Sequence, residues 1–217
     1  FLVLTIAGER LELTRFLPAR PAAAPSFVAI VTPILAGALL VPWREAAGLG
    51  VFAAGLLALA AWLLLYDIAR HNARQHGLTR FIAICLLSGY LWLGAAGLAG
   101  LAGGFAPGHA LHDAAMHAIA LGFVFSMVFG HAPIIFPAVA KVKIPWHPAF
   151  YLPLALLHGS LALRVAGGLA DAFGLRQWGG IANALALAAF ILTMVISVVR
   201  GRKAQPAGRR RRKRELG

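Results

Sequence analysis

The chain is poor in charged residues. Of its 217 residues, 12% are charged and 60% are hydrophobic, and the mean hydropathy is +0.80. Soluble domains carry about 25% charged residues. The chain therefore has about half of the charge that a soluble surface needs. This composition excludes an ordinary soluble domain and predicts a polytopic helical membrane protein with a single domain.

Cysteine and the familiar catalytic motifs are also scarce. The one cysteine, Cys85, excludes an internal disulfide. The sequence holds no paired nucleophile and base, no zinc signature and no nucleotide-binding motif. Nothing in it indicates a hydrolase, and whether the protein is an enzyme is left open.

Acidic residues are few, with 7 Asp and Glu against 20 Lys and Arg. The connections between the apolar segments alternate between two predicted sides of the membrane. Of the 20 Lys and Arg, 17 fall on one of these sides. The positive-inside rule makes that side cytoplasmic, in a bacterial inner membrane. We expect membrane lipids as partners, with the tail near anionic lipid, and no nucleic acid. These cations are Arg10, Arg15, Arg20, Arg70, Arg74, Arg80, Lys141, Lys143, Arg200 and eight in the C-terminal tail.

The apolar segments predict an all-α fold, a polytopic transmembrane helix bundle with six full spans and a partial first one. About 20 residues cross a hydrocarbon core of roughly 30 Å. The chain begins with Phe1, and 1–8 look like the end of a helix, so we expect a missing N-terminal half or other membrane subunits as partners. We place a cytoplasmic interfacial segment at 9–25, a basic cytoplasmic tail at 201–217, and spans at about 26–42, 47–67, 80–103, 111–140, 148–170 and 178–200.

Polar residues inside the spans are the candidate site, because ionisable groups in hydrocarbon are costly and usually functional. In the long fourth span, His117 and His131 are fourteen residues apart. In an α-helix this spacing puts them on one face, about 21 Å apart along the axis. His158 lies in the middle of the fifth span. We take His117, His131 and His158 as candidate metal ligands.

A second candidate group, formed by His112, His117 and Arg164, lies toward the outer side of the membrane, opposite the cytoplasmic side. Antiparallel pairing of the fourth and fifth spans brings Arg164 close to the turn of His117. In one interpretation His112 and His117 bind haem or metal, and Arg164 pairs with haem propionates. In the other, Arg164 forms an ion pair with Asp113 or Asp171 that ties two helices together. The sequence leaves both open.

The segments HAIALGFVFSMVFGHAPIIFPAV and LLHGSLALRVAGGL are similar to the second half of the NnrS family. The shared features are His117, the Gly130-His131 pair and the apolar run that ends in Arg164. The resemblance implies a polytopic membrane protein with haem, copper or both, linked to nitric-oxide or respiratory redox metabolism and distantly like the catalytic subunit of haem–copper oxidases. The chain departs from the family pattern after His131, where it continues Ala132-Pro133-Ile134.

Two hypotheses of different classes follow. In the first, the protein binds haem or copper through His112, His117, His131 and His158, with Arg164 in the same site. In the second, it is a non-catalytic membrane subunit or a small-solute transporter whose histidines are structural. Imidazole suits iron and copper alike, so the residue types alone do not choose the metal.

Overall fold

The computed structural model describes residues 1–18, 20–142 and 144–215, with side chains as far as Gly201 apart from that of Phe16. The described residues contain helices and no strand, which confirms the all-α class. In chain order the helices are α1 (Leu2–Leu13), η1 (Thr14–Phe16), α2 (Ala23–Leu40), α3 (Glu45–Tyr66), α4 (Ala69–Asn72), α5 (Gly77–Ala99), η2 (Gly100–Gly104), α6 (His112–His117), η3 (Ala118–Phe125), α7 (Ser126–Ala140), η4 (Pro148–Phe150), α8 (Tyr151–Leu169) and α9 (Phe173–Glu215).

Among the residues that the structure describes, six helical stretches are long and apolar enough to cross a membrane, which is the architecture of a helical membrane protein. Each of the six lies over one of the predicted spans, with ends that differ by a few residues. They are Ala23–Leu40, Glu45–Tyr66, Gly77–Gly104, His112–Ala140, Pro148–Leu169 and Phe173–Gly201.

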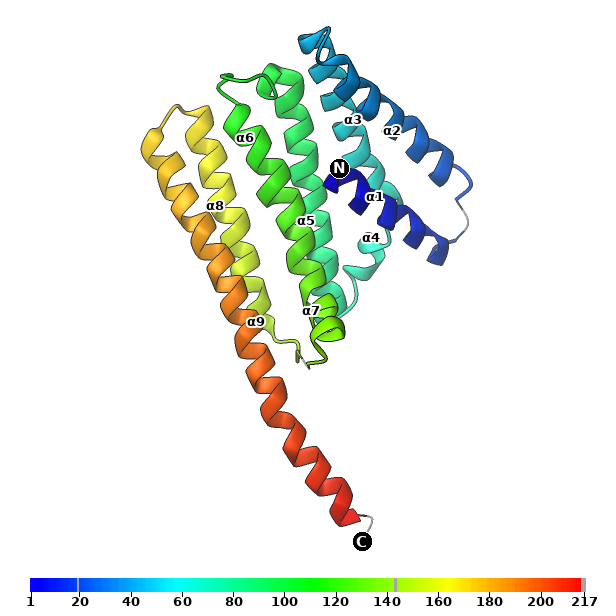
Figure 1. The fold of residues 1–217 in the computed structure, drawn as a ribbon, viewed down its shortest axis with the longest axis vertical. Coiled ribbons are helices and arrows are strands. Elements are labelled where there is room, and N and C mark those ends of the chain that lie inside the picture. The colour runs from blue at the N-terminus through cyan, green and yellow to red at the C-terminus, as the bar shows by residue number, and fades with distance from the viewer. Residues whose placement is uncertain (19, 143, 216–217) are drawn as a thin grey trace.

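The spans run up and down between two ends of the bundle (Figure 1). One end, here named the hairpin face, carries the connections at 41–44, 105–111 and 170–172. The other, the tail face, carries the connections at 67–76 and 141–147 and the extension of α9. Arg44 and Arg176 belong to the hairpin face. Lys143 and the tail side chains of 202–217 lie outside the described side chains.

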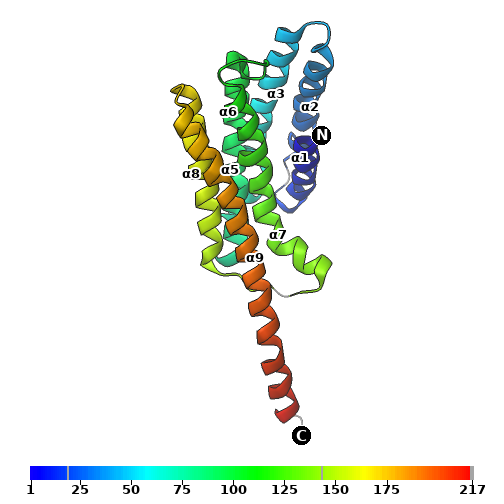
Figure 2. The same ribbon diagram turned by 60° about the vertical axis from the view of Figure 1, so that its left-hand side comes forward.

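The bundle has three parts (Figures 1 and 2). The α8–α9 hairpin packs on one side of α5, α6 and α7, and α2 with α3 packs on the other. Close approach at small residues holds neighbouring helices together, as is common in membranes. A Cβ on Gly37 of α2 would lie 2.5 Å from the Phe52 backbone nitrogen of α3.

The first helix differs from its prediction. We expected residues 9–25 to be interfacial, but α1 continues to Leu13 and carries Arg10 into the bundle, where it is 8% exposed. Charge alone suggested that Arg10 was part of a loop. The apolar residues around it keep the segment helical and pack against the core.

Helix α7 contains Pro133 and Pro137, and its last turns bend out of line (Figure 2). Proline lacks the N–H that would bond to the preceding turn, which accounts for the bend. The helix ends at Lys141, whose φ of 51° is left-handed.

Candidate functional site

A half-buried ion pair joins α6 to α8 near the hairpin face. The Arg164 guanidinium donates from Nε to Asp113 Oδ2 at 2.9 Å and from Nη2 to Oδ1 at 2.7 Å. Such two-bond pairs are strong and fix orientation. Asp113 lies in the first turn of α6, where the helix dipole favours a carboxylate. Of the partners considered from the sequence, the structure selects Asp113, because Asp171 instead lies 3.8 Å from Arg176.

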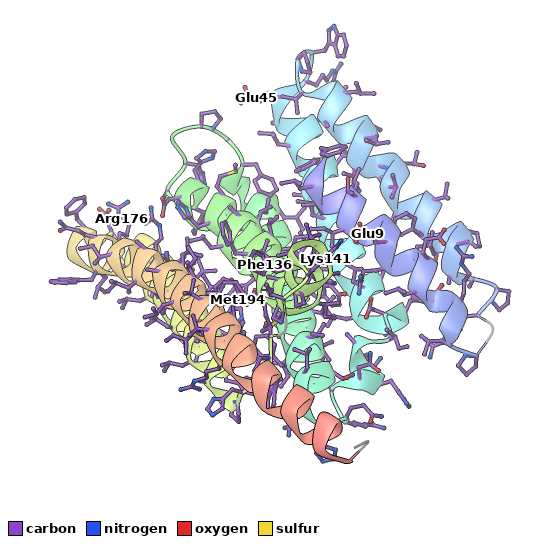
Figure 3. All side chains as sticks on the ribbon, turned by 60° about the horizontal axis from the view of Figure 1, so that its bottom comes forward. Glu9, Glu45, Phe136, Lys141, Arg176 and Met194 are labelled. Carbon is purple, nitrogen blue, oxygen red and sulfur yellow. The ribbon has the colours of Figure 1, made fainter. Side chains whose placement is uncertain are left out.

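Glycines on α9 make room for Arg164. A Cβ on Gly179 would lie 2.8 Å from the Arg164 Cα, and one on Gly180 would lie 2.7 Å from its Nη1. The pair also borders a cavity of about 320 Å³ that Phe173, Arg176 and Gln177 complete. Arg176 lies at the hairpin-face end of α9 (Figure 3).

His117 is held by the residue one turn before it. Its Nδ1 lies 2.8 Å from the Asp113 backbone oxygen and 3.3 Å from Asp113 Oδ1. A carbonyl oxygen can only accept, so Nδ1 carries the proton and Nε2 keeps its lone pair. The described hydrogen bonds include none to Nε2, and the side chain is 32% exposed. Asp113 thus orients His117 while Arg164 holds Asp113.

His131 has the same tautomer but a different neighbour. Its Nδ1 donates to the Met127 carbonyl at 2.7 Å, and its Nε2 lies 3.3 Å from Nη2 of Arg10 on α1. Guanidinium can only donate, so the lone pair of His131 Nε2 is already engaged by protein.

The prediction that His117 and His131 share a face is wrong. His117 contacts Asp113, which is paired with Arg164 of α8. His131 contacts Arg10 of α1, on the other side of the bundle. Between them η3 is a π-helix, which bonds five residues back instead of four. Each of its residues turns through a smaller angle, so the α-helical register is lost.

His158 pairs with an aromatic residue. Trp92 Nε1 donates to His158 Nδ1 at 2.9 Å, and the two rings are stacked with centroids 6.5 Å apart. Trp92 packs closely against Gly122 of η3, where an added Cβ would lie 2.4 Å from the Trp92 Cβ. Because Nδ1 accepts, the proton of the neutral ring is on Nε2, which is buried without a partner in the described structure.

His112 donates from Nδ1 to the Gly104 carbonyl at 3.1 Å. The structure therefore brings His117 and Arg164 together through Asp113 and leaves the other three predicted histidines with separate partners. Among the described residues, no group of three or more His, Cys, Asp and Glu side chains is placed to hold a metal ion.

A second polar group, which the sequence did not reveal, lies nearer the tail face. We name it the Arg10 cluster: Arg10 of α1, Asp67 after α3, Tyr90 of α5 and His131 of α7. Asp67 is 4% exposed and Tyr90 is fully buried. The sequence singled out His131, but Arg10 and Asp67 each stand next to a long apolar run, which is also how most loops begin.

The Arg10 cluster is incompletely bonded. Asp67 Oδ1 accepts from the Ala69 amide at 2.5 Å, but Asp67 Oδ2, the Tyr90 hydroxyl and Arg10 Nε have no hydrogen-bond partner in the described structure. Burial raises the pKa of the Asp67 carboxyl above its usual value, while Ala69, Arg10, Tyr90 and His131 act in the opposite direction.

Residues 1–199 match the model of a family described as a domain of unknown function (DUF8744). The chain belongs to this family. No curated protein and no solved structure matches the chain. The family description states no activity, so any functional conclusion depends on the two polar groups described above.

Proposed function

We propose that this protein binds haem in the bacterial inner membrane, where His117 would hold the haem iron, and that it has a redox or nitric-oxide-linked role like that implied by its resemblance to the NnrS family. One observation carries the proposal. His117 presents an unengaged Nε2 while its Nδ1–H is held by a backbone carbonyl and a carboxylate. Histidine ligands are typically oriented in this way, by a hydrogen bond from the nitrogen that does not bind the metal.

The other histidines fit the ligand role less well. His131 Nε2 already accepts from Arg10, and the Nε2 of His158 carries the ring proton because Trp92 occupies Nδ1. His112 is anchored through Nδ1, but it lacks a carboxylate contact like that of His117 to Asp113. Of the four histidines, His117 therefore has the Nε2 lone pair that is best oriented to bind a metal.

The donor set favours haem over a copper ion held by protein alone. A porphyrin supplies four nitrogens, so haem needs only one or two ligands from the chain. A copper site usually needs several side chains together, and the described residues show no such group. When bound, haem would supply one-electron chemistry. The chain's own part is to orient His117 through Asp113 and to offer Arg164 Nη1 and Arg176 as nearby cations.

The side assignment is part of this proposal. In the sequence, the cations concentrate in the segments that belong to the tail face, and by the positive-inside rule this supports a cytoplasmic C-terminus. The hairpin face, with Asp113, His117 and Arg164, then lies toward the periplasm.

The test is a visible absorption spectrum of the detergent-purified full-length protein, expressed with ample haem and recorded oxidised and dithionite-reduced. Metal analysis is done on the same sample. A Soret band with sharp reduced bands supports haem. Stoichiometric copper without those bands, or neither, contradicts it.

A second candidate is a non-catalytic membrane subunit whose polar groups only join helices. The pairs Arg164–Asp113 and Trp92–His158 favour it, because each crosses between helices with good geometry. This candidate requires a colourless protein whose histidine variants lose stability and no cofactor.

A further inference from the structure

Two acidic groups inside the bundle, the half-buried Asp113 and the buried Asp67, are bonded very differently. Asp113 receives both of its Arg164 bonds, at 2.7 and 2.9 Å, as a structural ion pair does. Asp67 is near the Arg10 guanidinium, yet no hydrogen bond joins the two, and its Oδ2 has no partner in the described structure. The Arg10 cluster is therefore not a two-bond ion pair like that of Asp113 and Arg164.

Four separate parts of the chain bring polar groups to this place. Arg10, Asp67 and Tyr90 are each more than nine-tenths buried, and each keeps one polar atom without a partner in the described structure. Buried polar atoms are nearly always bonded, and unpaired ones commonly mark bound water or a functional role. Ionisable groups at such positions in membrane proteins often form proton relays.

We propose that the Arg10 cluster is a proton-exchange site, in which the Asp67 carboxyl takes up and releases a proton that arrives from the tail face. Asp67 lies directly after α3, at the start of the connection 67–76 on that face. The titratable and charged groups that face it are Arg10 from α1, Tyr90 from α5 and His131 from α7.

The charge balance of the cluster explains why a proton can be held there. With Asp67 ionised, its charge offsets that of Arg10, and the neutral His131 accepts from Arg10 through Nε2. When a proton binds to Asp67 Oδ2, the carboxyl becomes a hydrogen-bond donor and the cluster gains one positive charge. The Tyr90 hydroxyl faces this carboxyl and is available as its partner in either state. This proposal does not depend on haem binding.

The experiment is infrared difference spectroscopy of the full-length protein in phosphatidylcholine vesicles, between successive pH values in H₂O and in D₂O. Above about pH 6, where exposed carboxyls are already ionised, we expect a carbonyl band of a protonated carboxyl that titrates with pH and shifts in D₂O, because burial raises the pKa of Asp67. It should be lost in Asp67→Asn and kept in Asp113→Asn, which changes the same kind of residue in the other site. A band that persists in Asp67→Asn overturns the proposal, as does the absence of a titrating band in the wild type.

If Asp67→Asn does not fold, Tyr90→Phe gives the answer by itself. It removes only the hydroxyl that faces Asp67, and we expect both the frequency and the titration midpoint of the band to change. An unchanged band in folded Tyr90→Phe overturns the assignment to Asp67.

Discussion

Arg164 and Asp113 form a two-bond ion pair between α8 and α6, and the same Asp113 orients His117. We expect Asp113→Asn to lower the free energy of unfolding by roughly 1–3 kcal/mol, because Arg164 keeps its charge and loses both the carboxylate charge and one of its two acceptor oxygens. Unfolding in mixed micelles with increasing sodium dodecyl sulfate measures this.

The control is Asp171→Asn, the same substitution at a carboxylate that is 99% exposed. It should change the free energy of unfolding by about 0.5 kcal/mol or less. Equal effects of the two substitutions would mean that the Arg164–Asp113 pair contributes nothing specific.

The fit of Arg164 against α9 gives a second prediction. Gly179→Ala places a methyl group 2.8 Å from the Arg164 Cα, so the helices must separate. We expect a loss of roughly 1–3 kcal/mol, as overpacking usually causes. Gly174→Ala, on the same helix with open space around it, should be neutral or slightly stabilising. A stable Gly179→Ala protein would contradict the close packing of α8 and α9.

Orientation in the membrane can be tested by chemical labelling. Cys85 is fully buried, so the natural protein should react little with a maleimide that does not cross membranes. In intact cells we expect Arg44→Cys, on the hairpin face, to be labelled and Arg74→Cys, on the tail face, to react only after lysis. The reverse pattern would place the tail face outside.

Hydropathy predicted the six spans well because a bilayer fixes both the length and the polarity of a crossing helix. Antiparallel pairing of the fourth and fifth spans also brought Arg164 within reach of the His117 turn and left Asp113 as one of its two candidate partners. The relation between His117 and His131 was predicted wrongly, since nothing in the apolar run Ala118–Phe125 distinguishes a π-helix from an α-helix.

The Arg10 cluster could not be predicted for a different reason. Arg10 and Asp67 are 57 positions apart along the chain, and each borders an apolar helix at a point where a loop is the ordinary expectation. The packing of α1 against α2 and α3, and the contact of Arg10 with His131 of α7, show that both are buried.

Haem ligation at His117 is tested most directly by reduced-minus-oxidised spectra of three purified variants: His117→Ala, His131→Ala and His158→Ala. We expect His117→Ala to lose the haem bands. His158→Ala should keep them, because the lone pair of that ring accepts from Trp92 and its Nε2 carries the proton. His131→Ala should keep them too, since Arg10 engages its Nε2. Haem bands that survive unchanged in His117→Ala would contradict the assignment.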